Sequence, residues 1–573
     1  MKKSAVLLSV MIVVVLTSCQ TPPPPPPTDT TAVYTRHHMI AAANPLAAEA
    51  GRKILRAGGS AIDAAIAAQM VLTLVEPQSS GIGGGAFLLY FDKSTGETRS
   101  YDGRETAPQS VTPDMFLTAD GTPKKFYDAA VGGSSVGVPG VVRMLEMVHR
   151  DFGKLPWREL FQPAIKLAEK GFIVSPRLAG LLEKDRFLRT MPESRDYFYD
   201  TDGSAWKTGT ILKNPKLAAT LKALADQGGD AFYAGPIAGE IVQTVRSALQ
   251  NPGGMTLTDL AGYQAKRRPP VCMAYRQWRV CGMGPPSSGG LTTLQILGIL
   301  EPFDLSGFAP FSARPVHLIA EASALAFADR NTYIADPDFI PVPTRGLIDK
   351  DYLAIRSSEI SRFKASGKRF PGMPGLGSKV EFAPSGNEHG LSTTHLSIVD
   401  DDGNALSMTS SIENAFGSRL MTGGFLLNNQ LTDFSFRPRR DNVPVANRVA
   451  PGKRPRSSMS PTLVFDKNRQ LEMAVGSPGG SRIIGYVTKT LIAALDWNMD
   501  MDAAIDAPNF VNRNGSTDLE AATDLAKLKP VLEDMGHRVK LVRQVSGLHG
   551  IRVTRYGLEG GADKRREGVA IGD

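Results

Sequence analysis

The sequence predicts a protein of mixed α and β structure, rich in helices over its first two-thirds and opening with strands in its last third. Between residues 140 and 350, apolar positions recur at helical spacing in segments separated by short loops. From Thr393 onward, apolar residues instead alternate along short runs, as in strands. The composition, 42% hydrophobic and 21% charged over 573 residues, is ordinary for a soluble globular protein with a large core.

The N-terminus has the pattern of an export signal. Lys2-Lys3 precedes an apolar run, Ala5 to Leu16, that is too short to span a bilayer. The run ends in Leu16-Thr17-Ser18-Cys19, which resembles the signal of bacterial lipoproteins, in which the Cys is lipidated. An ordinary secretory signal with an incidental Cys is the alternative. We therefore expect a signal peptide over residues 1–18 and lipidation of Cys19.

A proline-rich stalk follows over residues 19–38, since Pro22 to Pro27 favour an extended polyproline helix that holds the globular part off the membrane. The predicted location is that of an exported lipoprotein, anchored in a membrane and facing the periplasm or the cell surface. Gln20, directly after the lipidated Cys, favours the outer membrane.

Two helices are predicted over residues 45–76. Asn44-Pro45 starts the first, Gly58-Gly59 ends it, and Ser60 caps the second. A Gly-rich loop over 81–85 then leads into a strand over 87–91. Because this loop follows a helix and enters a strand, in the reverse of the nucleotide-binding order, it indicates a tight backbone turn or close packing rather than a phosphate site.

The remaining elements follow from the same patterns. Residues 364–392, rich in Gly, Pro, Ser and Lys, are expected to form an exposed and mobile connector. The predicted helices cover 139–152, 156–171, 213–227, 233–250, 288–301, 313–336, 482–497 and 521–535. The predicted strands cover 394–399, 405–410, 423–428, 461–466 and 471–475, the first two joined by a turn over 400–403.

Composition also excludes some functions. The net charge of +8 arises from basic residues spread along the chain without interleaved aromatics, so nucleic-acid binding is not expected. No His and Cys grouping has metal-ligand spacing, and neither a metal nor an organic cofactor is indicated.

Cys272 and Cys281 lie opposite each other if Arg276-Gln277 forms a hairpin turn. A disulfide and two buried free thiols both remain open, since Arg-Gln is poor turn chemistry.

Thr393 is the candidate nucleophile. If the Ser392–Thr393 bond were cut, Thr393 would carry a free α-amine, with a pKa of about 8, beside its own hydroxyl. Nucleophile and general base would then occupy one residue. The paired hydroxyls Ser457 and Ser458, the Gly-rich turn over 475–482, and the polar pair Gln430 and Asp433 supply further groups that attack on an amide needs.

These segments resemble the γ-glutamyltranspeptidase family of N-terminal-nucleophile hydrolases, from about residue 39 to the C-terminus. The matching motifs are the helix pair and Gly loop over 60–85, Arg104-Glu-Thr-Ala-Pro108, Gly137-Val-Pro-Gly140, the Pro-Pro-Ser-Ser-Gly-Gly turn over 285–290, and the Gly-Ala-Asp-x-Arg pattern over 561–565. The resemblance implies an α+β fold, a four-layer αββα sandwich. It also implies self-cleavage into a large subunit (39–392) and a small catalytic subunit (393–573) that share one core and form a heterodimer.

The implied activity is cleavage of the γ-glutamyl amide of glutathione and related compounds through a γ-glutamyl-Thr393 ester, passed to water or to an amino acid or peptide acceptor. In the family, Gly479 and Gly480 match the oxyanion hole, and the amine rather than His395 acts as base. The implied substrate contacts are Arg104, Ser457 and Ser458 for the α-carboxylate, and Gln430 and Asp433 for the α-ammonium.

The sequence departs from the family pattern in two places. Where well-studied members carry Thr and Asn, this chain has Ser411 and Glu413. Ser411 keeps a hydroxyl for Thr393, and Glu413 adds a carboxylate near the ammonium subsite. The stretch between Asp433 and Ser457 is also shorter than in members with a long lid, which predicts a more open pocket. The alternatives are a glutaryl or cephalosporin-type acylase of the same fold and a non-catalytic envelope lipoprotein that binds peptides.

Overall fold

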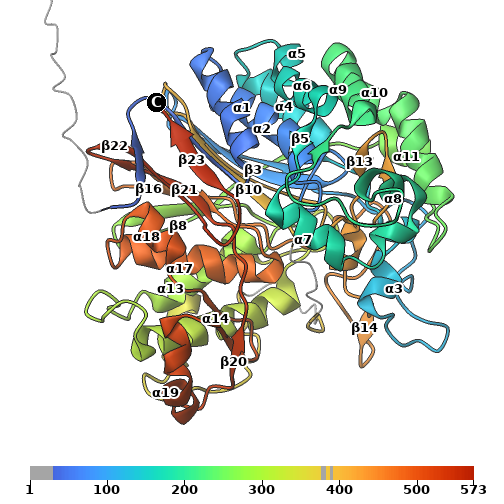
Figure 1. The fold of residues 1–573 in the computed structure, drawn as a ribbon. Coiled ribbons are helices and arrows are strands. Elements are labelled where there is room, and N and C mark those ends of the chain that lie inside the picture. The colour runs from blue at the N-terminus through green and yellow to red at the C-terminus, as the bar shows by residue number, and fades with distance from the viewer. Residues whose placement is uncertain (1–29, 376–381, 387–391) are drawn as a thin grey trace, which may run out of the picture.

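The computed structural model describes residues 30–375, 382–386 and 392–573, which form a sandwich of four layers (Figure 1). Two sheets lie face to face, and helices cover the outer face of each. This is the αββα arrangement that the family resemblance implied, so the predicted fold class is confirmed. The predicted signal peptide, Cys19 and the proline run lie outside the described residues.

Each sheet has seven strands in the described part of the chain, and all their pairings are antiparallel. The first sheet has the order β1 (Val33–Thr35), β22 (Gly557–Ala562), β21 (His549–Thr554), β17 (Leu471–Gly476), β16 (Thr462–Phe465), β9 (Trp278–Gly282) and β8 (Val271–Tyr275). The second has the order β23 (Val569–Gly572), β2 (Met39–Ala42), β10 (Thr394–Val399), β11 (Ala405–Ser411), β3 (Gly85–Asp92), β4 (Glu97–Gly103) and β7 (Lys266–Arg268).

The second sheet is buried on both faces. Along β2, Ile40 and Ala42 pack against the helices, whereas Met39 and Ala41 belong to the apolar layer between the two sheets. Successive side chains of a strand point to opposite faces, so a strand covered on both sides is apolar throughout. Burial on both faces is why β2 lacks the alternating pattern of a half-exposed strand and was not predicted from the sequence.

Helices form the two outer layers. Those of the first layer pack on the second sheet or continue its core: α1 (Pro45–Arg56), α2 (Ala61–Val75), α4 (Val141–Phe152), α5 (Trp157–Leu160), α6 (Gln162–Lys170), α7 (Pro176–Lys184), α8 (Pro192–Phe198), α9 (Pro215–Gln227), α10 (Asp230–Tyr233), α11 (Pro236–Arg246) and α12 (Leu257–Ala261), with α3 (Phe126–Ala130) at the edge. Those of the second layer are α13 (Gly289–Leu300), α14 (Ala313–Tyr333), α15 (Thr344–Leu347), α16 (Lys350–Ser358), α17 (Ile483–Leu495), α18 (Met501–Asp506) and α19 (Lys529–Asp534). Among the described residues, no helix combines the length and apolar character needed to cross a membrane.

Short elements complete the fold. The strands outside the two large sheets are β5 (Phe172–Ile173), β6 (Ile211–Leu212), β12 (Met421–Thr422), β13 (Phe425–Leu426), β14 (Arg439–Arg440), β15 (Val443–Pro444), β18 (Phe510–Asn512), β19 (Thr517–Glu520) and β20 (Val539–Val542). The 3₁₀ turns are η1 (Gly133–Ser135), η2 (Leu188–Thr190), η3 (Gln430–Asp433), η4 (Gly480–Arg482) and η5 (Asp524–Leu528).

Most predicted elements are confirmed, and the best-defined boundary is the start of α2. Ser60 and Asp63 form a capping box there, in which each side chain accepts from the other residue's backbone N–H.

The predicted turn at Arg276-Gln277 also forms, with Arg276 at a φ of 53°. Cys272 and Cys281 face each other across the resulting hairpin and form a disulfide.

Three predicted helices are shorter than expected or broken, and proline explains each case. The segment over 156–171 divides into α5 and α6, that over 233–250 contracts to α11, and that over 521–535 becomes η5 and α19. Pro163, Pro236 and Pro530 each occupy the first turn of the helix that does form. Proline lacks a backbone N–H and is tolerated in a helix only at this position.

The strand predicted over 423–428 is also wrong in extent, because only Phe425 and Leu426 are paired. Gly423 and Gly424, with φ of 53° and 82°, form the turn that joins β12 to β13. In the connector predicted over 364–392, most of residues 364–375 are exposed, as expected. Arg369 is buried there against Glu321, and Ala383 pairs with Val445, so parts of this segment pack on the globular body. Its mobility stays a prediction.

Candidate active site

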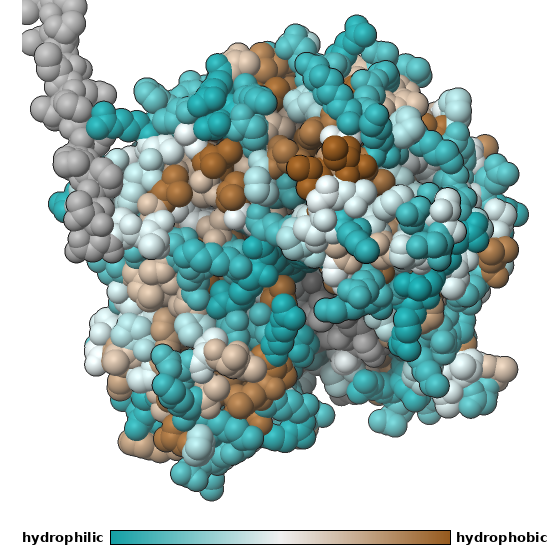
Figure 2. Space-filling view, viewed as in Figure 1, coloured by the Kyte–Doolittle hydropathy of each residue, from teal (hydrophilic) through white to brown (hydrophobic). Residues whose placement is uncertain are grey.

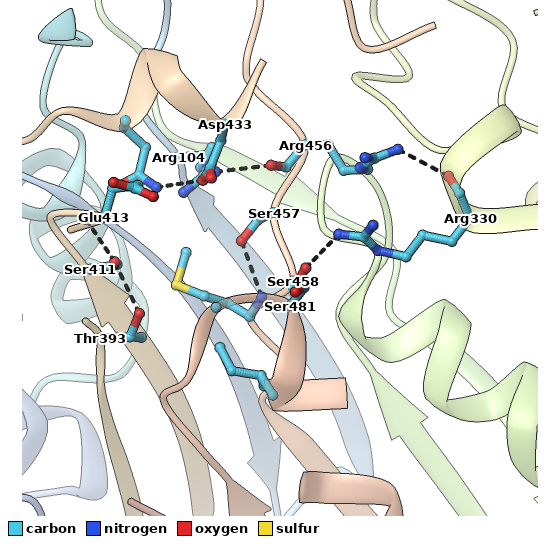
Figure 3. Close-up of a pocket in the computed structure, with 14 residues that line it drawn as sticks. Arg104, Arg330, Thr393, Ser411, Glu413, Asp433, Arg456, Ser457, Ser458 and Ser481 are labelled. Carbon is cyan, nitrogen blue, oxygen red and sulfur yellow. Dashed lines mark hydrogen bonds and ion pairs between the residues drawn. The ribbon is translucent and has the colours of Figure 1, made fainter. Parts of the chain in front are cut away.

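Thr393 lies directly before β10, in the middle of the second sheet, and is 4% exposed. Its Oγ1 donates a hydrogen bond to the carbonyl oxygen of Ser392 at 2.7 Å. The Ser411 hydroxyl oxygen lies 3.1 Å from Thr393 Oγ1 and donates to the same carbonyl at 3.0 Å. The hydroxyl of Thr393 is thus held beside the peptide carbonyl that precedes it, with a second hydroxyl in contact with both groups. Figure 3 shows the contact between Thr393 and Ser411.

Strand register places Ser411 there. β10 pairs with β11 so that Thr394 faces Ser410, which brings Ser411, at the end of β11, beside Thr393. On its other edge β11 pairs with β3, and Ser411 faces Gly85. The Gly-rich loop that precedes β3 packs tightly on this edge, since a Cβ on Gly84 would lie 2.2 Å from Ser411 O. The close packing predicted for this loop is confirmed, and the loop packs directly against Ser411.

A Gly-rich turn after β17 closes the pocket on the opposite side. Gly479 and Gly480 have φ of 136° and 59°, in the region that glycine alone adopts readily. A Cβ on Gly479 would also lie 2.7 Å from the Tyr486 ring. The turn leads through η4 into α17, so its backbone N–H groups lie at the positive end of a helix, where negative charge is stabilised.

The buried Arg104 and the partly exposed Asp433 form an ion pair at the far end of the pocket. Arg104, 1% exposed, donates from Nη2 to Asp433 Oδ2 at 2.5 Å and to the backbone carbonyl of residue 456, and from Nε to that of residue 455. Gln430 Nε2 donates to the same Asp433 oxygen at 2.7 Å. Within the described part of the chain, the buried Gln430 Oε1 has no hydrogen-bond partner. This amide oxygen is therefore an open acceptor beside a carboxylate.

Glu413 adds a second open acceptor. It is 3% exposed at a φ of 77°, and Asn429 Nδ2 donates to its Oε2, while Oε1 has no partner among the described residues. Burial, followed by the nearby charge of Asp433, raises the pKa of Glu413 well above its ordinary value. Without a neighbouring cation this shift opposes ionisation of the carboxyl group, and a cationic group placed against it would favour the ionised form, in which Oε1 is an acceptor.

Ser457 and Ser458 line the pocket from a third side. Both hydroxyl oxygens already accept a bond: Ser457 Oγ from the backbone N–H of Met459 at 3.1 Å, and Ser458 Oγ from Arg330 Nη2 at 2.7 Å. Because a hydroxyl has one hydrogen to donate, each serine keeps that hydrogen for an acceptor in the pocket.

Arg330 was not predicted as a site residue. It lies near the end of α14, and its Nε donates to Ser288 in the turn over 285–290. The turn was singled out from the sequence as one of the motifs of the family resemblance, without a partner for it. The α14 helix also buries His317, Glu321 and Asp329, so nothing in the local sequence marked Arg330 as the residue that reaches the pocket.

The structure therefore gathers nearly all of the predicted site residues around one pocket (Figure 3). Gly479 adjoins the lining residue Gly480, Ser392 borders a neighbouring cavity, and Cys19 lies outside the described residues. The predicted residues that line the pocket are Arg104, Thr393, Ser411, Glu413, Gln430, Asp433, Ser457, Ser458 and Gly480. The described residues contain no group of three His, Cys, Asp or Glu side chains that could hold a metal ion.

His395 lies two residues beyond Thr393 but does not enter the pocket. Its ring nitrogens contact the hydroxyls of Thr409 and Ser397, inside the sheet sandwich. Burial, together with the neighbouring His549, lowers the pKa of His395 well below its ordinary value. It is held as a neutral imidazole that links strands.

Comparisons with known proteins agree with this site. The family model described as "Gamma-glutamyltranspeptidase" matches residues 47–573. The "Glutathione hydrolase proenzyme" of Bacillus subtilis (strain 168) is 36% identical, over 93% of this chain and 91% of its own length. That of Escherichia coli (strain K12) is 37% identical, over 92% of this chain and 90% of its own length. The crystal structure of cephalosporin acylase from Bacillus halodurans superposes with a TM-score of 0.82 at 28% identity, covering 98% of this chain and 99% of the other.

Proposed function

The chain belongs to the γ-glutamyltranspeptidase family, and on this premise we propose that Thr393 is the nucleophile of both its self-cleavage and its catalysis. The protein is a self-processing γ-glutamyltransferase and glutathione hydrolase. It cleaves the γ-glutamyl amide bond of glutathione and related compounds. The γ-glutamyl group then passes to water or to the amine of an amino acid or peptide.

The contact between Thr393 Oγ1 and the Ser392 carbonyl carries this proposal. In the precursor, Thr393 Oγ attacks the Ser392 carbonyl carbon, and the C–N bond of the peptide breaks as an ester forms. The hydroxyl proton passes to the departing nitrogen, with Ser411 in contact with both oxygens. Water then hydrolyses the ester, which frees the Ser392 carboxylate and the α-amine of Thr393.

In the processed enzyme the α-amine takes the proton of Thr393 Oγ as this oxygen attacks the γ-carbonyl of the donor. Negative charge develops on the carbonyl oxygen, and the backbone N–H groups of Gly479 and Gly480 are the proposed donors to it. Loss of one such donor typically lowers the rate by about 10²–10³-fold. The leaving amine collects its proton from the α-ammonium, and water or an acceptor amine then attacks the ester.

The pocket fits the two charges of a glutamyl group. The Ser457 and Ser458 hydroxyls, the latter held by Arg330, have hydrogens left to donate to the α-carboxylate, and Arg104 is the nearby cation. Asp433, Gln430 Oε1 and Glu413 Oε1 offer acceptors for the α-ammonium. A buried acceptor without a partner is costly, so an ammonium group that satisfies two of them gains affinity.

Self-cleavage is tested by a denaturing gel of the purified protein. We expect wild type to give two bands, of about two-thirds and one-third of the chain, and Thr393→Ala to give one. Thr394→Val is a matched control, because the Thr394 hydroxyl is buried without a partner among the described residues and the exchange keeps its shape. A single uncleaved band from wild type would refute the self-processing mechanism.

The alternative, an acylase of the same fold, differs in its donor, because a glutaryl group lacks the α-ammonium. We expect kcat/KM for a γ-glutamyl anilide to exceed that for the glutaryl anilide by about 100-fold or more, since the glutaryl donor leaves the buried acceptors unsatisfied. Glu413→Ala should narrow this gap, mainly by slowing the γ-glutamyl donor. Turnover of the glutaryl compound alone would replace the γ-glutamyl assignment with the acylase.

We also propose that the enzyme is an exported lipoprotein anchored through Cys19. Support comes from the N-terminal sequence and from the Cys272–Cys281 disulfide, since disulfides persist in oxidising compartments. Wild type is expected in the membrane fraction of a Gram-negative host and Cys19→Ala in the soluble periplasmic fraction. Recovery of both proteins in the cytoplasm would contradict this location.

A further inference from the structure

Asn429 lies behind the catalytic pocket and connects two segments that line it. It directly precedes η3, which carries Gln430 and Asp433, and its side chain reaches the turn after β11 that carries Glu413. Hydrophilic side chains cover much of the surface, as the face in Figure 2 shows, whereas Asn429 and Glu413 are 0% and 3% exposed. Asn429 is not part of the pocket wall, so any effect on a substrate passes through the residues that it holds.

The contacts of the Asn429 side chain fix the orientation of its amide group. Oδ1 accepts a hydrogen bond from the backbone N–H of Asn414 at 3.0 Å. Of the two hydrogens on Nδ2, one is donated to Thr432 Oγ1 at 3.0 Å and the other to Glu413 Oε2. A flipped amide would set its NH2 group against the Asn414 N–H, donor against donor. Asn429 is therefore always the donor in its contact with Glu413.

This contact determines where a proton on Glu413 can lie. A neutral carboxyl group carries its hydrogen on one of its two oxygens. On Oε2 the hydrogen would point at the Asn429 N–H, so it lies on Oε1, which has no hydrogen-bond partner among the described residues. Oε2 is directed at Asn429, outside the pocket wall, and Oε1 is the oxygen left for a ligand. Neutral Glu413 thus offers a ligand a hydrogen-bond donor, and ionised Glu413 offers an acceptor.

The charged groups that face Glu413 come from three segments: Asp433 from η3, Arg104 from the end of β4, and Arg419 from the loop before β12. Figure 3 shows Glu413 on the same side of the pocket as Arg104 and Asp433. Both arginines already have carboxylate partners, Asp433 at 2.5 Å and Asp185 at 2.9 Å. A ligand ammonium is therefore a further cation for this site. While the carboxyl group of Glu413 keeps its proton, that ammonium meets a donor instead of an acceptor.

We propose that Asn429 is a positioning residue for substrate recognition: it holds the proton of neutral Glu413 on Oε1, and the ammonium group of an arriving glutamyl compound displaces that proton. The O–H bond of the carboxyl group breaks and its proton passes to the buffer. An N–H of the ammonium group, which keeps all three of its hydrogens, then donates to the oxygen left behind, so no further reactant is needed. This inference rests on the proposed γ-glutamyl activity.

The first test counts protons. Processed wild type is titrated in a calorimeter with L-glutamate, the hydrolysis product, and with glutarate, which lacks the ammonium group. Each titration is run in two buffers of different ionisation enthalpy, and the difference in binding enthalpy gives the number of protons released. We expect up to one proton more for glutamate than for glutarate at about pH 6, and a smaller excess as the pH rises and free Glu413 ionises. Both ligands place a carboxylate beside the α-amine of Thr393, so the excess belongs to the ammonium end.

The second test changes the two partners. Glu413→Gln should abolish the excess proton and weaken glutamate binding by about 10- to 100-fold, because Asn429 still donates and the new amide turns its NH2 group toward the ammonium. Asn429→Leu removes a hydrogen bond that lowers the pKa of Glu413, so the rise of glutamate affinity with pH should move to higher pH. Thr432→Val is the matched control. It removes the other acceptor of the same amide but leaves the contact with Glu413, and it should keep the wild-type proton count.

A double variant, Glu413→Gln with Asn429→Asp, reverses the polarity of the contact. The new carboxylate accepts from the new amide, whose oxygen is then left for the ligand. We expect it to recover most of the glutamate affinity that Glu413→Gln loses, without proton release. A residue that only supports the fold would not give this rescue, and the double variant decides the question if Asn429→Leu fails to fold.

Equal proton release with glutamate and glutarate by wild type would overturn the proposal. So would an Asn429→Leu defect that is the same at every pH and for both ligands, since that defect is purely structural. Hydrolysis of a γ-glutamyl anilide separates the two levels. No turnover by wild type counts against the proposed function, whereas turnover without the excess proton counts only against the role of Asn429.

Discussion

Glu105 is a fully buried carboxyl group behind the catalytic pocket. It follows Arg104, whose guanidinium lies 3.6 Å away, and neither of its side-chain oxygens has a hydrogen-bond partner among the described residues. Burial raises the pKa of Glu105 to about 8. A carboxyl group whose pKa is higher in the folded than in the unfolded state stabilises the fold at low pH. It loses that contribution progressively as the pH rises from the unfolded to the folded pKa.

Glu105→Gln should therefore change the pH dependence of stability. Below the unfolded pKa of 4.5 both side chains are neutral, and the two proteins should unfold at similar temperatures. Between that value and about 8, the unfolded wild type ionises while the folded protein does not, so wild type should lose on the order of 5 kcal/mol relative to the variant. Thermal unfolding of both proteins in the uncleaved Thr393→Ala background, from pH 4 to pH 9, measures this difference. Parallel curves over the whole range would show that Glu105 is already ionised in the fold.

Site residues could be identified from the sequence where they belong to a recognisable local motif. Thr393, Asp433 and the Gly-rich turn over 475–482 were noticed in short segments of the sequence, whereas Ser411 and the role of Gly479 and Gly480 came from the family resemblance. Arg330 was missed because its partner, Ser458, is far away in the sequence. Only the folded chain brings such pairs together.

At the scale of elements, caps and prolines fixed boundaries better than hydrophobic periodicity did. The Ser60 capping box located the start of α2, whereas apolar spacing alone joined α5 to α6 across a proline. The strands at the C-terminus, β18 to β23, were not predicted. In the large sheets, β22 is short and rich in glycine. Burial on both faces also removes the alternation of polar and apolar residues that identifies a half-exposed strand.

Each of the two large sheets contains strands from both sides of the predicted cleavage point. In the second sheet, β2, β3, β4 and β7 precede residue 392, whereas β10, β11 and β23 follow it. The order β23-β2-β10-β11-β3 alternates the two halves, so β2 is hydrogen-bonded on both edges to strands from beyond the cut. The first sheet mixes β1, β8 and β9 with later strands in the same way.

We therefore expect the cleaved chain to stay together as one folding unit. Breaking the Ser392–Thr393 bond leaves every strand pairing in place, and separation would expose the apolar layer between the sheets as well as the pairing edges of β2. Processed wild type should elute from a size-exclusion column with uncleaved Thr393→Ala, while its denaturing gel shows two bands. In urea the two fragments should unfold in a single transition and separate only there. Elution of the one-third fragment in native buffer would show that the pieces dock as separate domains instead of sharing a core.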